Sequence, residues 1–314
     1  MCTWLWRPCS APIRDRPSGA TFRIPDGMIV DAHTHVGSRE HFSPRFVAEM
    51  VRAWGEMNWP EDDLAAHREA MEEVDRAIVV AMDAPAVGMV VPDRYVSEYV
   101  ASQPDKLVGF ASVDPNRPDA LERLTFAVEE LGLTGLKVGP IYQHFDPTSP
   151  PAIALFRRAE KLGLPVLCHQ GTTFVSDAPL RWARPFLIDD VARACPDLRL
   201  FIAHLGHPWC EETMAVIRKH PNLYADVSAL HTRPVQLYMA LRSAIEYRAT
   251  EKLLFGSDFP FATPAGTAEA LRSVNDSVGV GWPPIPTEII EQIIRSPALR
   301  VLGLEDEVAQ EGVV

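Results

Sequence analysis

The segment Ile-Val-Asp-Ala-His-Thr-His-Val-Gly, residues 29–37, places two histidines one residue apart at the end of an apolar run. Residues i and i+2 of a β-strand point to the same side, so His33 and His35 project together while Thr34 points away. Two imidazoles about 6–7 Å apart along a strand can both reach one metal ion. The segment therefore predicts one half of a metal site, if other strands bring the remaining ligands.

Further candidate ligands stand where other apolar runs end: His169, His204 and Asp258. A single buried histidine at a strand end is more often a hydrogen-bonded core residue, and the aspartate of Gly-Ser-Asp also suits a helix N-cap. Core hydrogen bonding and helix capping could each explain one such residue, but they do not explain why several metal-ligand types stand together at the ends of strands. The nitrogens and carboxylate of a complete set suit one divalent ion, Zn²⁺ or alternatively Mn²⁺, with room for water. The predicted metal ligands are His33, His35, His169 and Asp258.

Polar residues near two other strand ends are candidates for contacts with a substrate. Lys137 ends the run 134–140, and we interpret it as a partner for a substrate carboxylate because a compact ammonium suits one. Two alternatives stay open for Lys137: a salt bridge at the rim, and a carboxylated lysine that bridges a second metal. Tyr142, His144 and His207 follow strand ends, and we expect them on the rim of the pocket. The remaining histidines are expected at the surface or in loops: His41, His67, His220 and His231. Of these, His67 and His220 fall in helical patterns, and we expect both to be solvated.

The elements that position these residues alternate along the chain. Near-continuous aliphatic runs, typical of parallel strands buried on both faces, cover 28–36, 76–83, 107–115, 134–140, 164–171, 198–206, 222–229 and 252–260. Amphipathic patterns predict helices over 61–74, 120–132, 151–163, 185–196 and 211–221, with a closing helical segment over 288–304. Such alternation predicts parallel βα units.

The fold that this alternation predicts is a single-domain (β/α)₈ TIM barrel over residues 28–304. A doubly wound open sheet is the alternative, but no GxGxxG motif follows the first strand. The segment 37–60 follows the first strand and carries several aromatic residues, so in a barrel it would wall or cover the pocket.

Two stretches lie outside the predicted domain. Residues 1–27 are interpreted as an N-terminal extension, poorly ordered over 1–20, and residues 305–314 as a C-terminal tail. Met28 directly precedes the first strand, so it is a hypothetical natural start.

The composition limits the partners that we expect. Asp and Glu outnumber Lys and Arg by 42 to 30, and a surface with a formal net charge of −12 repels nucleic acid. No apolar run is long enough to span a bilayer. The five cysteines form no CxxC pair, which favours reduced thiols in the cytoplasm, with Cys168 in the core. We expect a small-molecule substrate; the aromatic residues Trp54 and Trp59 suit either a lid or the interface of a homodimer.

The chain resembles the amidohydrolase superfamily, and within it the amidohydrolase-related group that includes aminocarboxymuconate-semialdehyde decarboxylase and pyrone dicarboxylate lactonase. The motifs that carry the resemblance are DAHTHVG (31–37), LKVGP (136–140), CHQGT (168–172), AHLGHPW (203–209) and FGSDFPF (255–261). They follow the family's order at the intervals of barrel strands. The resemblance implies a barrel with a catalytic divalent metal bound by the four predicted ligands.

The resemblance also implies roles for two further residues. His204 takes the position of a catalytic or carbonyl-polarising histidine, and Lys137 that of the carboxylated lysine that bridges two metals in binuclear relatives. A single metal is commoner in this group, so the second metal is the minority expectation. Members that decarboxylate aromatic acids often carry Glu in place of the first histidine, although aminocarboxymuconate-semialdehyde decarboxylase has the HxH form too. The histidine at position 33 therefore favours hydrolysis over decarboxylation but does not decide between them.

The chemistry that we expect first is hydrolysis of a lactone, ester or amide. A divalent metal lowers the pKa of bound water from about 15.7 toward about 7, Asp258 takes up and delivers the proton, and His204 polarises the carbonyl. The alternative is non-oxidative decarboxylation of an aromatic or conjugated acid by the same residues. A metal-binding protein without activity is a third class, but a complete ligand set at the catalytic face of a barrel argues against it.

Overall fold

The computed structural model describes residues 27–55 and 59–305. The predicted extension, 1–27, and tail, 305–314, lie outside these ranges except for residues 27 and 305. The hypothesis that Met28 is the natural start stays a prediction.

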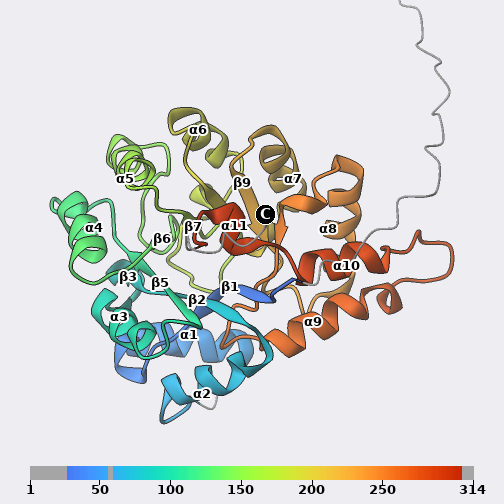
Figure 1. The fold of residues 1–314 in the computed structure, drawn as a ribbon, viewed down its shortest axis with the longest axis horizontal. Coiled ribbons are helices and arrows are strands. Elements are labelled where there is room, and N and C mark those ends of the chain that lie inside the picture. The colour runs from blue at the N-terminus through green and yellow to red at the C-terminus, as the bar shows by residue number, and fades with distance from the viewer. Residues whose placement is uncertain (1–26, 56–58, 306–314) are drawn as a thin grey trace, which may run out of the picture.

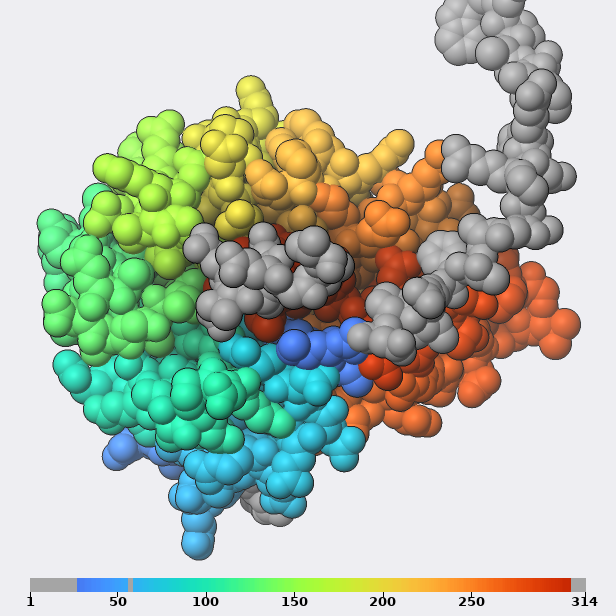
Figure 2. Space-filling view, viewed as in Figure 1, coloured from blue at the N-terminus to red at the C-terminus, as the bar shows by residue number. Residues whose placement is uncertain are grey.

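Eight parallel strands form one sheet in the order β1-β2-β5-β6-β7-β8-β9-β10. The first and last strands are joined, because the Ala32 amide donates to the Phe255 carbonyl at 2.9 Å and Thr34 forms a parallel bridge with Phe259. Helices surround the sheet (Figure 1), and consecutive parts of the chain follow one another around the molecule in Figure 2. The predicted (β/α)₈ barrel is confirmed. Its strands are β1 Val30–His35, β2 Arg76–Val80, β5 Leu107–Ser112, β6 Gly135–Val138, β7 Val166–Cys168, β8 Leu200–Ile202, β9 Leu223–Asp226 and β10 Leu253–Leu254.

The helices include all those that the amphipathic patterns predict, together with several more. The predicted segment over 288–304 divides into two helices at Pro297, because proline cannot continue a helix. None of the described helices combines the length and the apolar character needed to cross a bilayer. The α-helices are α1 Pro44–Trp54, α2 Asp63–Ala70, α3 Asp93–Ala101, α4 Ala120–Glu129, α5 Pro150–Lys161, α6 Leu187–Ala194, α7 Cys210–Lys219, α8 Pro234–Tyr247, α9 Pro264–Arg272, α10 Thr287–Ile294 and α11 Ala298–Leu302.

Two short elements shape the rim of the barrel. Helix α1 lies in the segment expected to wall the pocket, and it begins where the Ser43 hydroxyl accepts a hydrogen bond from the Phe46 amide, with Pro44 at the first helical position. A hairpin follows β2 and pairs β3, Met82–Ala84, with β4, Met89–Val91. A capping serine followed by proline was the signal in the sequence for α1.

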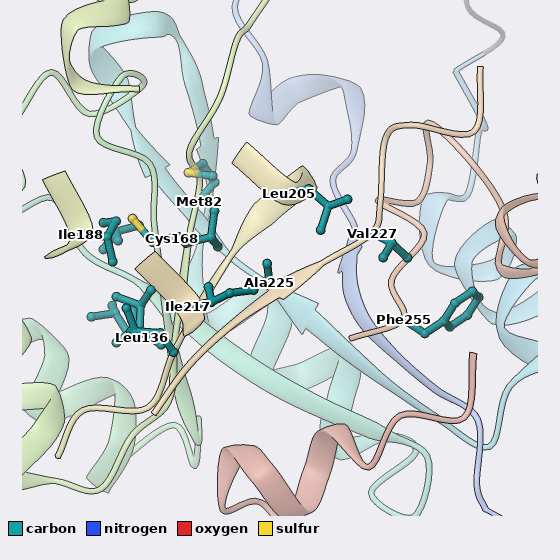
Figure 3. Packing of buried hydrophobic residues seen from close by; sticks show 14 of the residues in the cluster. Met82, Leu136, Cys168, Ile188, Leu205, Ile217, Ala225, Val227 and Phe255 are labelled. Carbon is teal, nitrogen blue, oxygen red and sulfur yellow. The ribbon is translucent and has the colours of Figure 1, made fainter. Parts of the chain in front are cut away.

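Two hydrophobic layers hold the barrel together. Inside it, Ile78, Phe110 and Phe201 pack with residues of α11, which lies across the centre of the view in Figure 1. The second layer lies between the strands and the surrounding helices, and Figure 3 shows Cys168 and Ile188 within it. Cys168 is fully buried and unpaired, so its predicted place in the core is confirmed.

A β-bulge in β1 lies between Asp31 and Thr34 and thus includes the first of the two histidines. Asp31 pairs with Ala77 and Thr34 with Val79, so β1 has one more residue than β2 over this stretch. Strict alternation along the strand would place Asp31 on the same face as His33 and His35, and the extra residue of the bulge removes this relation. Asp31 Oδ1 instead accepts hydrogen bonds from the backbone amides of His33, at 3.1 Å, and Ser257, at 2.9 Å.

The prediction that His67 is solvated is wrong. His67 of α2 is fully buried against β1, with Nε2 2.8 Å from Thr34 Oγ1 and Nδ1 2.9 Å from Tyr99 Oη. Thr34 Oγ1 donates to the Ile78 carbonyl, so His67 Nε2 carries the proton and donates to Thr34. Periodicity alone could not distinguish this histidine from a surface one. His220 is half-buried, with Nε2 2.7 Å from Asp189 Oδ1.

Replacing His67 tests how strongly this contact holds α2 to the strand of the two histidines. His67→Ala leaves a cavity and removes two buried hydrogen bonds, so we expect the free energy of unfolding to fall by about 3 kcal/mol in chemical denaturation. Arg68→Ala is the matched control, because Arg68 is exposed on the same helix. Equal stability of the two variants would contradict the role of His67.

Candidate active site

Three donor atoms converge at the carboxyl ends of β1 and β10. The Nε2 atoms of His33 and His35 lie 3.1 Å apart, and Asp258 Oδ1 lies 3.5 Å from the former and 3.2 Å from the latter. Nitrogen and carboxylate donors gathered this closely suit a divalent metal. The structure thus brings together three of the four predicted ligands, and these three atoms are called the donor cluster below.

A buried carboxylate at the end of β9, Asp226, sets the orientation of the His33 ring. Asp226 Oδ2 accepts a hydrogen bond from His33 Nδ1 at 3.0 Å, and both side chains are fully buried. Because an ionised carboxylate only accepts, Nδ1 carries the ring proton and Nε2 keeps its lone pair. That lone pair belongs to the donor cluster, and a carboxylate behind a histidine is the usual support for a metal ligand.

The same carboxylate orients His204 through Ser228. His204 Nδ1 lies 2.7 Å from Ser228 Oγ, and this hydroxyl donates to Asp226 Oδ1. His204 Nδ1 is therefore the donor to Ser228, which leaves the Nε2 lone pair free. His204 and Asp226 also lie close enough to His33 to form a second group of ligand-type atoms. Their hydrogen bonds to one another mark this second group as a support for the donor cluster.

Asp258 reaches the donor cluster from a turn that follows β10. Its φ is 62°, in the left-handed region that aspartate tolerates better than most residues and that recurs at functional sites. The Asp258 amide donates to the His33 carbonyl at 2.8 Å, and the His35 amide donates to the Phe259 carbonyl at 2.8 Å. These backbone bonds fix the carboxylate beside the two histidines.

His169 follows β7 and borders the same cavity as the donor cluster. Its ring centroid lies 5.0 Å from that of His204 and 4.6 Å from that of Tyr142. Its Nε2 is buried without a hydrogen-bond partner among the described residues, an arrangement that costs free energy unless something binds there. His169 lies outside the tight donor cluster, but this orphaned nitrogen fits a fourth metal ligand.

Lys137 on β6 places a cation against the donor cluster. Its side chain is almost completely buried, and Nζ donates to His33 Nε2 at 2.8 Å. Burial lowers the pKa of Lys137 to about 8. Lys137 also lines the cavity, so its ammonium can reach both the donor cluster and a bound molecule.

The site histidines are neutral imidazoles. Burial, reinforced by the charge of Lys137, lowers the pKa of His33 and His35 well below the usual value. The same two effects lower the pKa of His169 to about 3. For His204, burial followed by the neighbouring histidines lowers the pKa in the same direction. Neutral rings keep a lone pair on one nitrogen, which is the form that binds a metal.

The cavity that borders the donor cluster has a largely apolar lining. The segment 37–60 supplies much of it, so the prediction that this segment walls the pocket is confirmed. Trp54 packs on Phe174 and Phe261, with ring centroids 4.5 Å and 4.7 Å apart. The apolar side chains of the lining include Phe42, Phe46, Met50, Trp59, Met82, Met89, Phe174 and Phe261.

Of the other three predicted substrate contacts, one lines the cavity and two do not. Tyr142 lines the cavity beside Lys137, and burial raises the pKa of its hydroxyl. His144 is not among the cavity-lining residues; its φ of 53° marks a left-handed turn, and its Nε2 is buried without a partner in the described chain. His207 lies in a separate surface hollow with Trp209, because the left-handed turn at His204 redirects the chain.

The comparison with known families decides the classification. A family model described as Amidohydrolase matches residues 30–304. This protein belongs to the amidohydrolase family. The resemblance that the five sequence motifs indicate is thereby confirmed.

One curated protein is similar to this amidohydrolase over most of the chain. A curated relative, 2-amino-3-carboxymuconate-6-semialdehyde decarboxylase of Dictyostelium discoideum, is 20% identical over 244 residues, 67% of this chain and 65% of that protein. The chain thus spans about two thirds of the length of this relative.

Two solved structures show the same fold at low identity. A dihydroxybenzoic acid decarboxylase of a Polaromonas species, with bound manganese and the inhibitor 2-nitroresorcinol, has a TM-score of 0.62, with 17% identity over 90% of this chain and 99% of that one. A probable 2-pyrone-4,6-dicarboxylic acid hydrolase of Acinetobacter baumannii, with citric acid bound, has a TM-score of 0.60, with 14% identity over 88% of this chain and 99% of that one. Likeness at this level establishes the fold alone.

The supports of the site were missed by reasoning from the sequence. The sequence motifs assign no role to Asp226 or Ser228. A signal for both was present, because an aspartate at a strand end and a serine two residues later point to the same face. Asp63 of α2 also lines the cavity of this amidohydrolase, whereas the amphipathic pattern over 61–74 predicts only that it lies in a helix.

Asp226 is expected to support metal binding without being a ligand. Asp226→Asn removes the charge that fixes the His33 tautomer, so we expect the affinity for Mn²⁺ to fall about 10–100-fold in isothermal titration calorimetry. Asp189→Asn is the matched control, because Asp189 also pairs with a histidine, His220, but at a partly exposed site remote from the cavity. Equal affinities in the two variants would remove Asp226 from this role.

Proposed function

We propose that this amidohydrolase is a metal-dependent decarboxylase, which removes CO₂ without oxidation from a small aromatic or conjugated carboxylic acid. The observation that carries the proposal is the position of Lys137, whose buried ammonium borders both the donor cluster and a largely apolar cavity. The Dictyostelium and Polaromonas relatives are decarboxylases by name, which supports the same reaction. The comparisons favour the reaction that the sequence alone placed second.

One divalent ion is the cofactor that we propose. His33, His35 and Asp258 would hold it, with His169 as a fourth ligand, because neutral imidazoles and a carboxylate suit such an ion. Zn²⁺ and Mn²⁺ both fit this donor set, and the Polaromonas relative holds manganese. When bound, the ion would withdraw electron density from oxygen atoms of the substrate. We retain the second metal, bridged by a carboxylated Lys137, as the minority alternative.

The side chains around the cavity would bind and orient the acid. The Lys137 ammonium pairs with the substrate carboxylate, and the surrounding apolar lining strengthens this pairing by excluding water. His204 offers the free Nε2 of a neutral imidazole, which accepts a hydrogen bond from a hydroxyl on the substrate. Tyr142 lies beside His169 and closes the same part of the cavity.

Release of CO₂ requires a proton for the carbon that loses it. Asp258 borders the cavity; its Oδ1 belongs to the donor cluster, which leaves Oδ2 as the atom that would carry the proton to the substrate. The bond between the substrate carbon and the carboxyl carbon breaks, and its electron pair stays on the substrate carbon. The proton of Asp258 then forms the new C–H bond as CO₂ leaves.

Hydrolysis of a lactone, ester or amide is the second candidate. The observation in its favour is the pair of neighbouring histidines, His33 and His35, which both contribute to the donor cluster. The fold neighbour from Acinetobacter, a probable pyrone dicarboxylic acid hydrolase, is consistent with it. In this reaction Asp258 would take a proton from water and return it to the leaving group.

The substrate class, the oligomeric state and the cellular compartment are also part of the proposal. A small molecule is the partner that a cavity of this kind suits. We retain the homodimer and the cytoplasm as proposals, which light scattering of the purified protein and fractionation of its native cells would test.

Turnover of a compound panel separates the two candidate reactions. We expect the Mn²⁺-loaded protein to release CO₂ from aromatic or conjugated acids, measured by gas-phase mass spectrometry, and to leave lactones and amides unchanged. Asp258→Asn should lose this activity. Acid release from a lactone without CO₂ from any acid would establish hydrolysis instead.

Lys137 is expected to act on substrate binding. Lys137→Met keeps the length of the side chain but removes the ammonium, so we expect KM for the acid to rise about 10–100-fold, in line with the loss of a charged hydrogen bond. Metal content, measured by elemental analysis, should not change. Loss of a second metal equivalent on this substitution would favour the bridging role.

A further inference from the structure

The lining of the cavity differs between the strand ends and the segments that follow them. The strand ends supply most of its polar groups, among them Lys137 and His204. Helix α1, the β3–β4 hairpin and the segments after β7 and β10 supply mainly apolar side chains. In a barrel these following segments form the rim, so the apolar surface stands over the part of the cavity away from the strand ends. We call it the rim wall; its main residues are Phe42, Phe46, Met50, Met89, Phe174 and Phe261.

We propose that the acid that this amidohydrolase takes is a monocarboxylate with an apolar substituent remote from the carboxylate, bound against the rim wall. This inference rests on the proposed function for the reaction, but it concerns the shape and charge of the substrate. The inference narrows the proposed substrates, because many acids could undergo the proposed decarboxylation.

The rim wall is a packed surface built from several segments of the chain. Phe46 of α1 lies 5.3 Å from Phe174 and 5.5 Å from Phe42, measured between ring centroids. Phe42 also forms a backbone bridge with Met89 of the hairpin. Because these contacts already hold the wall in place, an apolar substituent that lies on it displaces water without ordering a loop. Met50 and Met89 add flexible side chains that adapt to substituents of different shape.

A negative charge at the same cavity opposes a second carboxylate on the substrate. Asp63 of α2 lines the cavity, and its two oxygens accept hydrogen bonds from the Gly37 amide and the Tyr95 hydroxyl, both at 2.7 Å. Among the described residues of the lining, Lys137 is the only lysine or arginine, and it stands at the donor cluster. A dicarboxylate that places one group on Lys137 would leave the other against apolar side chains and Asp63, which is unfavourable.

Binding of unreactive acids measures this preference without depending on the reaction. The probes are benzoate, 4-butylbenzoate, 3-butylbenzoate and terephthalate, titrated into the Mn²⁺-loaded full chain by calorimetry. We expect one of the butyl acids to bind at least about tenfold more tightly than benzoate, as burial of several methylene groups predicts. We expect terephthalate to bind more weakly than benzoate.

A charge placed on the rim wall should reverse the preference. Phe174 lies on a loop and is only partly buried, so Phe174→Arg is expected to fold. We expect this variant to bind terephthalate about tenfold more tightly than the unmodified protein does and to lose the gain from the butyl group. Phe126→Arg is the matched control, because Phe126 is exposed on α4 and does not line the cavity; its affinities should not change.

The outcomes distinguish this inference from the proposed function. A butyl preference that Phe174→Arg abolishes supports the inference even if the panel of acids releases no CO₂. CO₂ release combined with equal affinity for all four probes would overturn the inference and leave the proposed reaction standing. Tighter binding of terephthalate than of the butyl acids, or no binding of any probe, would overturn it as well.

Discussion

The carboxylate of Asp226 is the group on which the geometry of the site depends. It is fully buried and accepts hydrogen bonds from the His33 ring, the His204 amide, and both the amide and the hydroxyl of Ser228. A buried carboxylate is tolerable only when its acceptors are satisfied, so each donor must keep its place. The requirement ties β1, the turn after β8 and the segment after β9 to one another. It also leaves His33 and His204 each with a lone pair on Nε2, which faces the donor cluster in His33 and is the form of the ring that binds a metal.

The sequence was sufficient to predict the barrel and the ligand-bearing strand ends. Strands buried on both faces leave aliphatic runs that few other structures require, and each run is found as a strand. Rules of alternation were less reliable within a strand. The bulge between Asp31 and Thr34 changes the face on which Asp31 lies relative to the histidines, and nothing in the local sequence specifies where an extra residue is accommodated. His67 was misplaced for a related reason, because helical periodicity reports a face but not what packs against it.

The part of the candidate site that lies directly at strand ends was predictable, because the carboxyl ends of parallel strands meet at one edge of the barrel. That rule brings His33, His35 and Asp258 together without any knowledge of the turns between them. It does not extend to residues further along a turn. The left-handed backbone at His204 sends His207 to a separate hollow, and His144 occupies a left-handed turn outside the cavity lining. The supporting hydrogen bonds of Asp226 depend on distances of a few tenths of an ångström, which only the assembled barrel provides.

The hydrogen bond from the Asp258 amide to the His33 carbonyl also has a consequence for the order of assembly. One side of the donor cluster comes from the first strand of the barrel, and the other comes from the segment after the last strand. During synthesis the histidines leave the ribosome long before their carboxylate partner does, so a nascent or truncated chain holds only part of the ligand set. Contacts between such distant positions form late, because they require closure of the whole ring of strands. Tight binding of the proposed metal ion would thereby require the finished molecule.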